Sequence, residues 1–142
     1  MRLINFNFTK INVERLKEKA DKITFNTKID INSIDSFKSE LKIKEDLLKI
    51  DFVYTVSYEP EFAKVELGGS FILSVEPKIA KEVLNGWKDK KTSEEFRVAI
   101  FNVIMKKSNI KALQLEDEIG LPIHVPMPSL SPQKKKEEKE SQ

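Results

Sequence analysis

The sequence contains no cysteine, a single histidine and only four glycines. Without cysteine the chain forms no disulfide, thiolate metal site or thiol nucleophile, and such a composition suits a reducing compartment, the cytoplasm. The lone His124 needs carboxylate-only partners to hold a metal, so neither a metal nor another cofactor is expected. No Gly-rich phosphate loop and no GxSxG motif is present. These absences point away from an enzyme.

Long apolar runs and a strong excess of one charge are also missing. No stretch approaches the ~20 apolar residues of a membrane span, and the N-terminus lacks the apolar core of a signal peptide. The 142 residues carry 25 Lys plus Arg against 23 Asp plus Glu, without the basic surplus of nucleic-acid binders. We expect one domain over residues 1–130. The charged tail, residues 131–142, is predicted to be disordered because it contains no apolar residue.

Four segments alternate apolar and polar residues, which indicates antiparallel strands with one covered face. The apolar members of the first two are Ile4, Phe6, Phe8 and Ile23, Phe25, Ile29, Ile31. Those of the last two are Leu48, Ile50, Phe52, Tyr54, Val56, Tyr58 and Ala63, Val65, Leu67, Phe71, Leu73, Val75. Glu59-Pro60-Glu61 predicts a hairpin between the last two strands. Gly68-Gly69 predicts a bulge or a close backbone approach, and the charged Val13–Lys22 a short helix or a loop.

Helical spacing replaces alternation after the fourth segment. Pro77 predicts the first turn of a short helix, which Asn85-Gly86 would end. Thr92 to Glu95 predicts a capping box that opens a longer helix, from Ser93 to about Glu118. The acidic run at the end of this helix, Glu116 to Glu118, is interpreted as a solvated helix end.

The longer helix is apolar around most of its circumference. One arc carries Phe96, Ala99, Ile100, Val103 and Ile104, and the nearly opposite arc carries Val98, Phe101 and Met105. A surface helix needs only one apolar stripe, so the second arc is interpreted as an oligomer interface. The alternative is that the short preceding helix covers this second arc.

A proline-rich apolar segment follows Gly120, with four prolines in eleven residues. Proline extends neither a helix nor a central strand, so we expect an extended crossover that covers a groove. His124 within it is interpreted as a structural or exposed histidine.

Aromatic and apolar residues of the chain form a candidate client-binding groove. Methionine and aromatic side chains adapt to many partners, and ordinary core is the alternative interpretation. The set predicted from the residues is Phe52, Tyr54, Tyr58, Phe71 and Trp87, together with the crossover that contains Met127.

The order of four antiparallel strands, a long helix and a proline-containing crossover resembles the prokaryotic SecB-like export chaperones over about residues 1–130. The VELGGSF segment is similar to the family's Glu-x-x-Gly-Gly-x-Phe strand, with one residue fewer before the glycines. Its matching residues are Glu66, Gly68, Gly69 and Phe71. The run from Asn102 through IGLPIHVPMPSL is similar to the family's main helix and crossover, with turning points at Gly120, Pro122 and Pro126.

The resemblance implies an α+β fold, a four-stranded antiparallel sheet with one face covered by a long helix. It also implies a homotetramer, built as a dimer of dimers through sheet edges and long helices. The implied function is ATP-independent holding of unfolded polypeptides in hydrophobic grooves, which keeps preproteins competent for export. The groove positions carried over from the family are Phe71, Leu121, Ile123, Val125 and Met127.

Two departures from the family leave alternatives open. The net charge of +2 differs from the strongly acidic export members, which argues against docking to an export motor. The family's C-terminal helix is replaced by a short charged tail. The alternatives to a general holding chaperone are a dedicated toxin–antitoxin chaperone and a nucleic-acid or small-ligand binding module on an aromatic sheet face.

Overall fold

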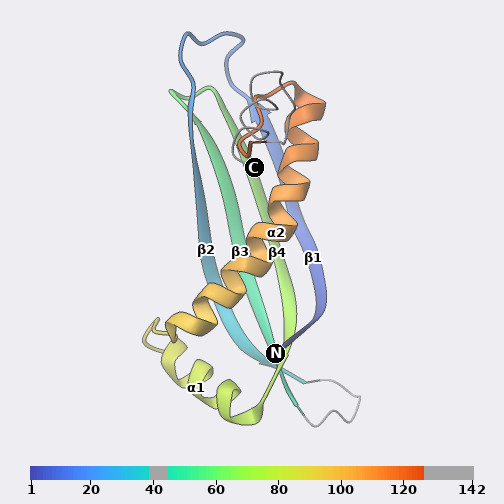
Figure 1. Ribbon diagram of the computed structural model, residues 1–142, viewed down its shortest axis with the longest axis vertical. Helices are drawn as coiled ribbons and strands as arrows, with labels where there is room; N and C mark the ends of the chain where they lie inside the picture. The colour runs from blue at the N-terminus through green and yellow to red at the C-terminus, as the bar shows by residue number, and fades with distance from the viewer. Residues whose placement is uncertain (39–44, 127–142) are drawn as a thin grey trace, which may run out of the picture.

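The computed structural model of the chain describes residues 1–38 and 45–126. It contains a four-stranded antiparallel sheet followed by two helices, one of them long, which confirms the predicted α+β class (Figure 1). The elements are β1 (Arg2–Arg15), β2 (Thr24–Phe37), β3 (Asp46–Glu59), β4 (Ala63–Val75), α1 (Pro77–Trp87) and α2 (Glu94–Ile119).

The strands pair in the order β1-β4-β3-β2, so the first two strands of the sequence form the two edges of the sheet. β3 and β4 form the predicted hairpin. Helix α2 crosses the sheet diagonally, from the end where α1 lies to the opposite end near β1 (Figure 1), and packs against β4, β1 and β3. Helix α1 packs against β2 and β3. Both helices therefore cover the same face.

The core lies between this face and α2. The alternating apolar residues of the third and fourth predicted strands, Leu48, Ile50, Phe52, Tyr54, Val56, Tyr58 and Ala63, Val65, Leu67, Phe71, Leu73, Val75, are each at most 3% exposed. Phe96, Ile100 and Ile104 of α2 pack against them, at most 4% exposed. The period of two in the strands and of 3.6 in the helix thus assigned the covered faces correctly.

The first strand is longer than its alternation predicted. β1 continues to Arg15, and residues 16–23 form a loop, so the helix alternative for this segment is wrong. Arg15 stabilises the loop, because its guanidinium donates to the carbonyl oxygens of Lys17 at 3.1 Å and Glu18 at 2.7 Å. The next residue, Leu16, donates its backbone N–H to the carbonyl oxygen of Phe62. These bonds provide the partners that a helix would have supplied.

The glycine pair of β4 marks a close approach between strands. A Cβ atom on Gly69 would lie 2.5 Å from the carbonyl oxygen of Asn7 and 3.0 Å from the Phe52 ring. The register shift lies in β1, between Phe8 and Lys10, opposite the glycines. The predicted close approach is confirmed, and the irregularity belongs to the neighbouring strand.

Both helices differ from their predicted ends by a residue or so. α1 ends at Trp87, one residue past Gly86, whose carbonyl oxygen accepts the N–H of Lys91 at 2.8 Å. α2 is capped by Ser93, whose hydroxyl accepts the backbone N–H of Phe96 at 3.2 Å. The capping box predicted from Thr92 is therefore wrong, because Ser93 takes the N-cap role one residue later.

Candidate functional site

The C-terminal half of α2 carries a charged side chain into the core. Glu116 is 0% exposed, whereas Asp117 and Glu118 beside it are exposed. The prediction of a solvated acidic run is wrong for Glu116, because it lies on the same row of the helix as Ser108 and Ala112, which face the sheet. A buried carboxylate is costly unless it is paired, and Glu116 has a partner.

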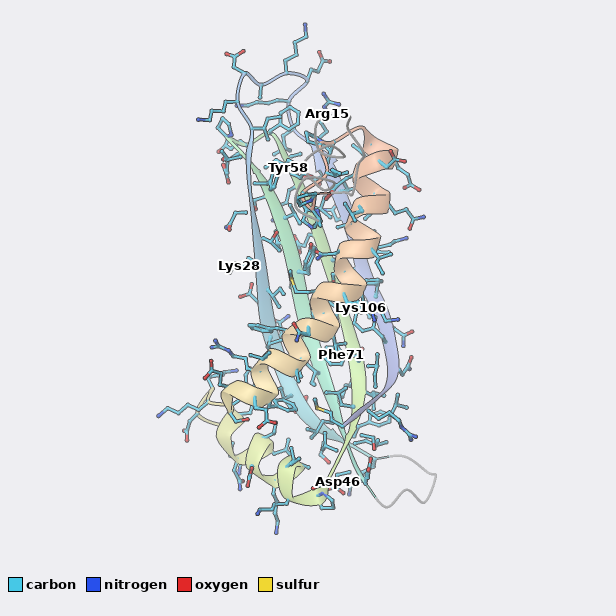
Figure 2. All side chains as sticks on the ribbon, viewed as in Figure 1. Arg15, Lys28, Asp46, Tyr58, Phe71 and Lys106 are labelled. Atoms are coloured by element: carbon cyan, nitrogen blue, oxygen red, sulfur yellow. The ribbon has the colours of Figure 1, made fainter. Side chains whose placement is uncertain are left out.

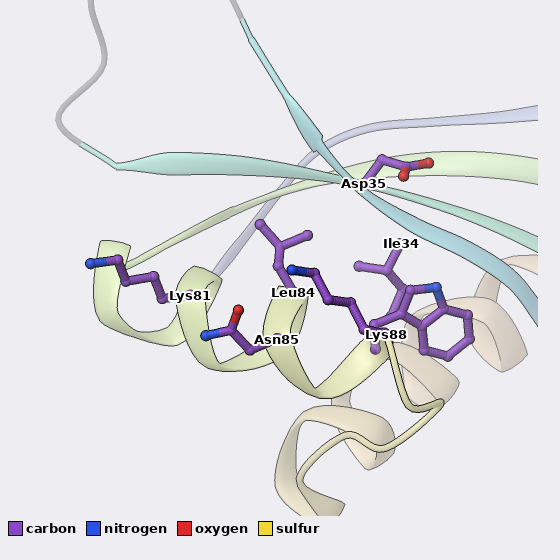
Figure 3. Close-up of a pocket in the computed structure, with 7 residues that line it drawn as sticks. Ile34, Asp35, Lys81, Leu84, Asn85 and Lys88 are labelled. Carbon is purple, nitrogen blue, oxygen red and sulfur yellow. The ribbon is translucent and has the colours of Figure 1, made fainter.

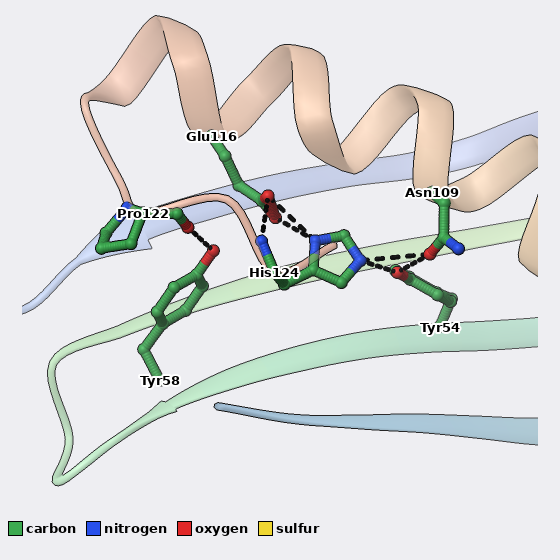
Figure 4. Close-up of polar contacts among 6 residues, drawn as sticks. All are labelled: Tyr54, Tyr58, Asn109, Glu116, Pro122 and His124. Carbon is green, nitrogen blue, oxygen red and sulfur yellow. Dashed lines mark hydrogen bonds and ion pairs between the residues drawn. The ribbon is translucent and has the colours of Figure 1, made fainter. Parts of the chain in front are cut away.

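That partner is His124, which comes from the crossover (Figure 4). Its Nδ1 lies 2.9 Å from Oε1 and 2.7 Å from Oε2 of Glu116, and its backbone N–H donates to Oε1 at 3.1 Å. The His124 side chain is only 2% exposed. One carboxylate therefore fixes both the ring and the main chain of His124, which is a structural histidine.

The opposite ring nitrogen of His124 faces two further oxygens (Figure 4). Nε2 lies 2.6 Å from the hydroxyl of Tyr54 and 3.1 Å from Oδ1 of Asn109, and the hydroxyl donates to the same Oδ1. The Tyr54 hydroxyl, the Asn109 amide oxygen and the His124 ring thus lie within hydrogen-bond distance of one another. Both ring nitrogens of His124 therefore lie within hydrogen-bond distance of side-chain oxygens. We call Tyr54, Asn109, Glu116 and His124 the latch.

A second tyrosine of β3 also bonds the crossover. The hydroxyl of Tyr58 donates to the carbonyl oxygen of Pro122. Burial, with a smaller contribution from the negative charge of Glu116, raises the pKa of Tyr54 and of Tyr58 well above the usual range of tyrosine. Both phenols therefore remain neutral donors. Together they fasten residues 122 and 124 to the sheet.

The crossover, residues 121–126, leaves α2 through a defined turn. Gly120 adopts φ 76°, a left-handed conformation that favours glycine. The N–H of Leu121 then donates to the carbonyl oxygen of Glu116 at 2.8 Å. Leu121 is 6% exposed, whereas Ile123 is 40% exposed. The crossover therefore buries residues 121 and 124 and presents Ile123 outward.

Next to the crossover, β2 leaves apolar side chains partly uncovered. The β-sheet register places three of its residues opposite Phe52, Tyr54 and Tyr58, on the face that the helices cover. Helix α2 packs against β4, β1 and β3 instead, and Phe25 remains 47% exposed. Its ring lies 5.8 Å from that of Tyr58. We define the apolar strip as Phe25, Ile29 and Ile31 of β2 with Ile123 and Val125 of the crossover.

The residues predicted for an oligomer interface lie on α2. Phe101 and Met105 precede Asn109 by eight and four residues, so the three form one row on the side of α2 that faces Tyr54. Val98 is 48% and Met105 36% exposed, and Phe101 is half-buried against the core. Their burial in a second copy remains a prediction.

Four of the predicted polypeptide-binding residues belong to the core. Phe52, Tyr54, Tyr58 and Phe71 are each at most 1% exposed. Figure 2 shows Tyr58 on the part of the sheet beside the crossover and Phe71 beneath α2. The alternative interpretation as ordinary core therefore describes them, because α2 and the crossover cover the face on which they alternate. Phe52, Tyr54 and Tyr58 lie opposite the β2 residues of the strip, and none of the four offers a free surface to a client.

Trp87 lies apart from the other predicted residues, at the α1 end of the sheet. It is half-buried, and Lys90 Nζ lies 4.3 Å from its ring centroid. It lines a cavity of about 490 Å³ between α1 and β2 (Figure 3), with Ile34, Asp35, Lys81, Leu84, Asn85 and Lys88. The structure does not bring Trp87 together with the crossover.

The crossover residues predicted to line a groove have different environments. Leu121 is buried, Val125 half-buried and Ile123 exposed. Met127 lies outside the described residues.

Within residues 1–38 and 45–126, no group of three or more His, Asp and Glu side chains is placed to hold a metal ion. No helix in that same part of the chain has the length and hydropathy to cross a membrane.

The sheet, the long diagonal helix and the crossover together define a SecB-like fold. One solved structure with this fold is that of Mycobacterium tuberculosis Rv1957, a SecB-like chaperone, in complex with a ChAD peptide from the Rv1956 HigA1 antitoxin. It matches with a TM-score of 0.52 at 10% sequence identity, over 92% of this chain and 90% of that one. No protein-family model matches the sequence, and no curated protein is significantly similar to it.

Sequence reasoning missed the latch and the contribution of β2. Glu116 follows Ile104, Ser108 and Ala112 at intervals of four, and all four are buried. Extending the buried row by one step would have placed Glu116 inside. The β2 residues of the apolar strip were identified as strand residues, but their exposure depends on which strands α2 crosses.

Proposed function

We propose that this chain is an ATP-independent chaperone that holds unfolded or nonnative polypeptides against the apolar strip. The observation that supports this most directly is that two separate elements expose apolar side chains around the same tyrosine, because the Tyr58 ring lies 5.8 Å from that of Phe25 and its hydroxyl bonds Pro122, the residue before Ile123. Phe25 of β2 is 47% and Ile123 of the crossover 40% exposed. Burying apolar surface contributes ~25 cal/mol per Å², so this mode of holding needs no nucleotide.

The position of β2 adds a second source of affinity. β2 is an edge of the described sheet, paired with β3 alone. An extended client can therefore add backbone hydrogen bonds along β2. Its alternate side chains would then lie beside Phe25, Ile29 and Ile31. This geometry suits nonnative chains of varied sequence, because backbone groups are common to all of them.

The first test is aggregation of heat-denatured citrate synthase, followed by light scattering without nucleotide. We expect the protein to suppress aggregation at near-stoichiometric ratios. Ile123→Ser should weaken the protection, and Phe25→Ser/Ile123→Ser should remove most of it, because both changes place a hydroxyl on the apolar strip.

Ile110→Ser is the matched control. Ile110 is 65% exposed on α2 and shares its helix row with the exposed Lys106 and Gln114. The same substitution there removes as much apolar surface without touching the strip. Equal protection by the Ile123→Ser and Ile110→Ser proteins would show that the strip is not the client site.

The antitoxin peptide bound to Rv1957 favours a narrower second candidate, a chaperone dedicated to one antitoxin. The two candidates differ in client range. A general holding chaperone protects several unrelated denatured proteins with similar efficiency, whereas a dedicated one protects a single partner. Parallel aggregation assays with citrate synthase, luciferase and insulin B chain separate them.

A nucleic-acid module on an aromatic face has less support. Stacking requires exposed rings, and the rings of Phe52, Tyr54, Tyr58 and Phe71 are buried.

We also infer a cytoplasmic, non-catalytic protein that works without cofactor and forms homo-oligomers through Val98, Phe101 and Met105. Multi-angle light scattering checks the oligomer, and Val98→Ser/Met105→Ser should lower the measured mass.

A further inference from the structure

We propose that the latch positions the crossover as a preformed wall of the client-binding strip, with Glu116 and His124 as positioning residues. This inference rests on the proposed holding function. Residues 121–126 belong to no helix or strand, so hydrogen bonds and buried side chains must fix their position. The latch supplies these bonds from α2 and β3, two elements of the rigid core.

The latch affects the strip because one of its residues is adjacent in the chain to two residues of the strip. His124 is buried and stands between Ile123 and Val125, the two crossover residues of the strip. Glu116 accepts both the backbone N–H and the ring N–H of His124. Fixing a residue at its main chain and its side chain also fixes its neighbours. The latch therefore sets where Ile123 lies relative to Phe25.

The Tyr58 bond to Pro122 strengthens this arrangement. Phe25 packs against the same Tyr58 ring, with centroids 5.8 Å apart. One tyrosine thus contacts the β2 side of the strip with its ring and ties the crossover side with its hydroxyl. A wall held in this way needs no ordering when a client binds, and preordered sites bind more tightly.

Loss of the latch should loosen the wall without removing any strip residue. His124→Ala leaves the Glu116 carboxylate buried without its partner, which drives the crossover to open so that water reaches it. Client binding must then also order the crossover, and the entropy lost in doing so reduces the affinity. We expect binding to weaken about ten-fold, the effect of ordering roughly two side chains on association.

The test uses the full chain and fluorescently labelled, reduced carboxymethylated α-lactalbumin, a permanently unfolded client, with fluorescence anisotropy as the readout. His124→Ala and the milder Tyr54→Phe/Tyr58→Phe should both raise Kd. The second variant keeps the buried rings and the contact between Glu116 and His124, so it decides the matter if the first does not fold. Val83→Ala, a core change in α1, controls for stability loss alone.

A second readout is independent of client binding. His124 is the only histidine, so its ring nitrogens give one unambiguous set of NMR signals. We expect a His124 ring N–H that is protected from solvent exchange in the wild type, because the side chain is 2% exposed, and faster exchange in Tyr54→Phe/Tyr58→Phe, where the crossover is held less firmly. Rapid exchange in the wild type would show that the latch does not exist in solution.

The outcomes separate this inference from the proposed function. A wild-type protein that ignores the client while His124 stays protected contradicts the holding function. A wild-type protein that binds, with latch variants that bind equally well, contradicts the positioning role. Tighter binding by the latch variants also overturns it, because the crossover would then cover the site instead of forming its wall.

Discussion

The two halves of α2 bury their inner faces by different means. In the N-terminal half, Phe96, Ile100 and Ile104 pack as large apolar side chains on the sheet. In the C-terminal half the same row continues with Ala112 and Glu116, small and charged, and the space is filled by the crossover. The first half packs directly on strands, and the second packs through an additional segment held by hydrogen bonds.

This difference predicts different responses to mutation. Apolar packing loses free energy in proportion to the volume removed and tolerates similar replacements. A buried, hydrogen-bonded pair depends on both partners, because removing either one leaves the other as a buried polar group without its partner. In the N-terminal half, the loss in free energy of unfolding should therefore grow with the volume that a mutation removes. In the C-terminal half, changing one member of the pair should cost nearly as much as losing the whole interaction, and changing both together should cost less.

The largest expected effect is in the C-terminal half. Glu116→Ala leaves the backbone N–H and the ring of His124 without their partner and empties a fully buried position, so it should lower the free energy of unfolding by about 3–5 kcal/mol. Urea unfolding followed by the fluorescence of the single Trp87 measures it. Replacing both partners, Glu116→Met with His124→Leu, should recover most of the loss. A double variant as unstable as the sum of its single changes would contradict the paired behaviour.

The next effect is in the N-terminal half. Ile104 is 0% exposed, so Ile104→Ala should lower the free energy of unfolding by roughly 3 kcal/mol through lost burial and a residual cavity. The same urea titration applies. Ile110→Ala, at a 65% exposed position of the same helix, should change it by less than about 0.5 kcal/mol. If the two changes cost the same, burial does not control stability here.

Alkaline pH tests the packing under the C-terminal half of α2, because Tyr54 and Tyr58 of β3 lie there. Tyrosines of the unfolded chain lose their protons near pH 10, whereas burial and Glu116 raise the pKa of Tyr54 and Tyr58 in the folded chain. The folded state therefore retains protons that the unfolded state releases. Stability is complete below about pH 10 and falls as pH rises, by about 1.4 kcal/mol per pH unit for each tyrosine.

This effect can be read from two signals. Tyr54 and Tyr58 are the only tyrosines, so tyrosinate absorbance should rise together with loss of helical circular dichroism. Ile104→Ala should shift the onset through global stability but leave the slope unchanged, whereas Tyr58→Phe should halve the slope. Tyrosinate that forms before any unfolding would show that the two phenols are not protected.

Much of the fold followed from local patterns. Alternation in Leu48–Tyr58 and Ala63–Val75 identified the buried face of the central strands, because a strand side chain has only two faces to choose from. The sequence did not show that β1 and β2 both become edges, since the strand order depends on long-range pairing. Of the residues that the sequence suggested for a client site, Ile123 and Val125 lie in the partly exposed strip, whereas Phe52, Tyr54, Tyr58 and Phe71 belong to the core; their role in binding remains a prediction.

By itself, the sequence determined the α+β class, the covered face of each central strand and the existence of a crossover after Gly120. These depend on period, proline and glycine, which act within a few residues of each other. Only the tertiary structure decided that Glu116 and His124 pair inside the core and that β2 stays partly uncovered. Both depend on the diagonal path of α2 across the sheet, which is set by packing between residues far apart in the chain.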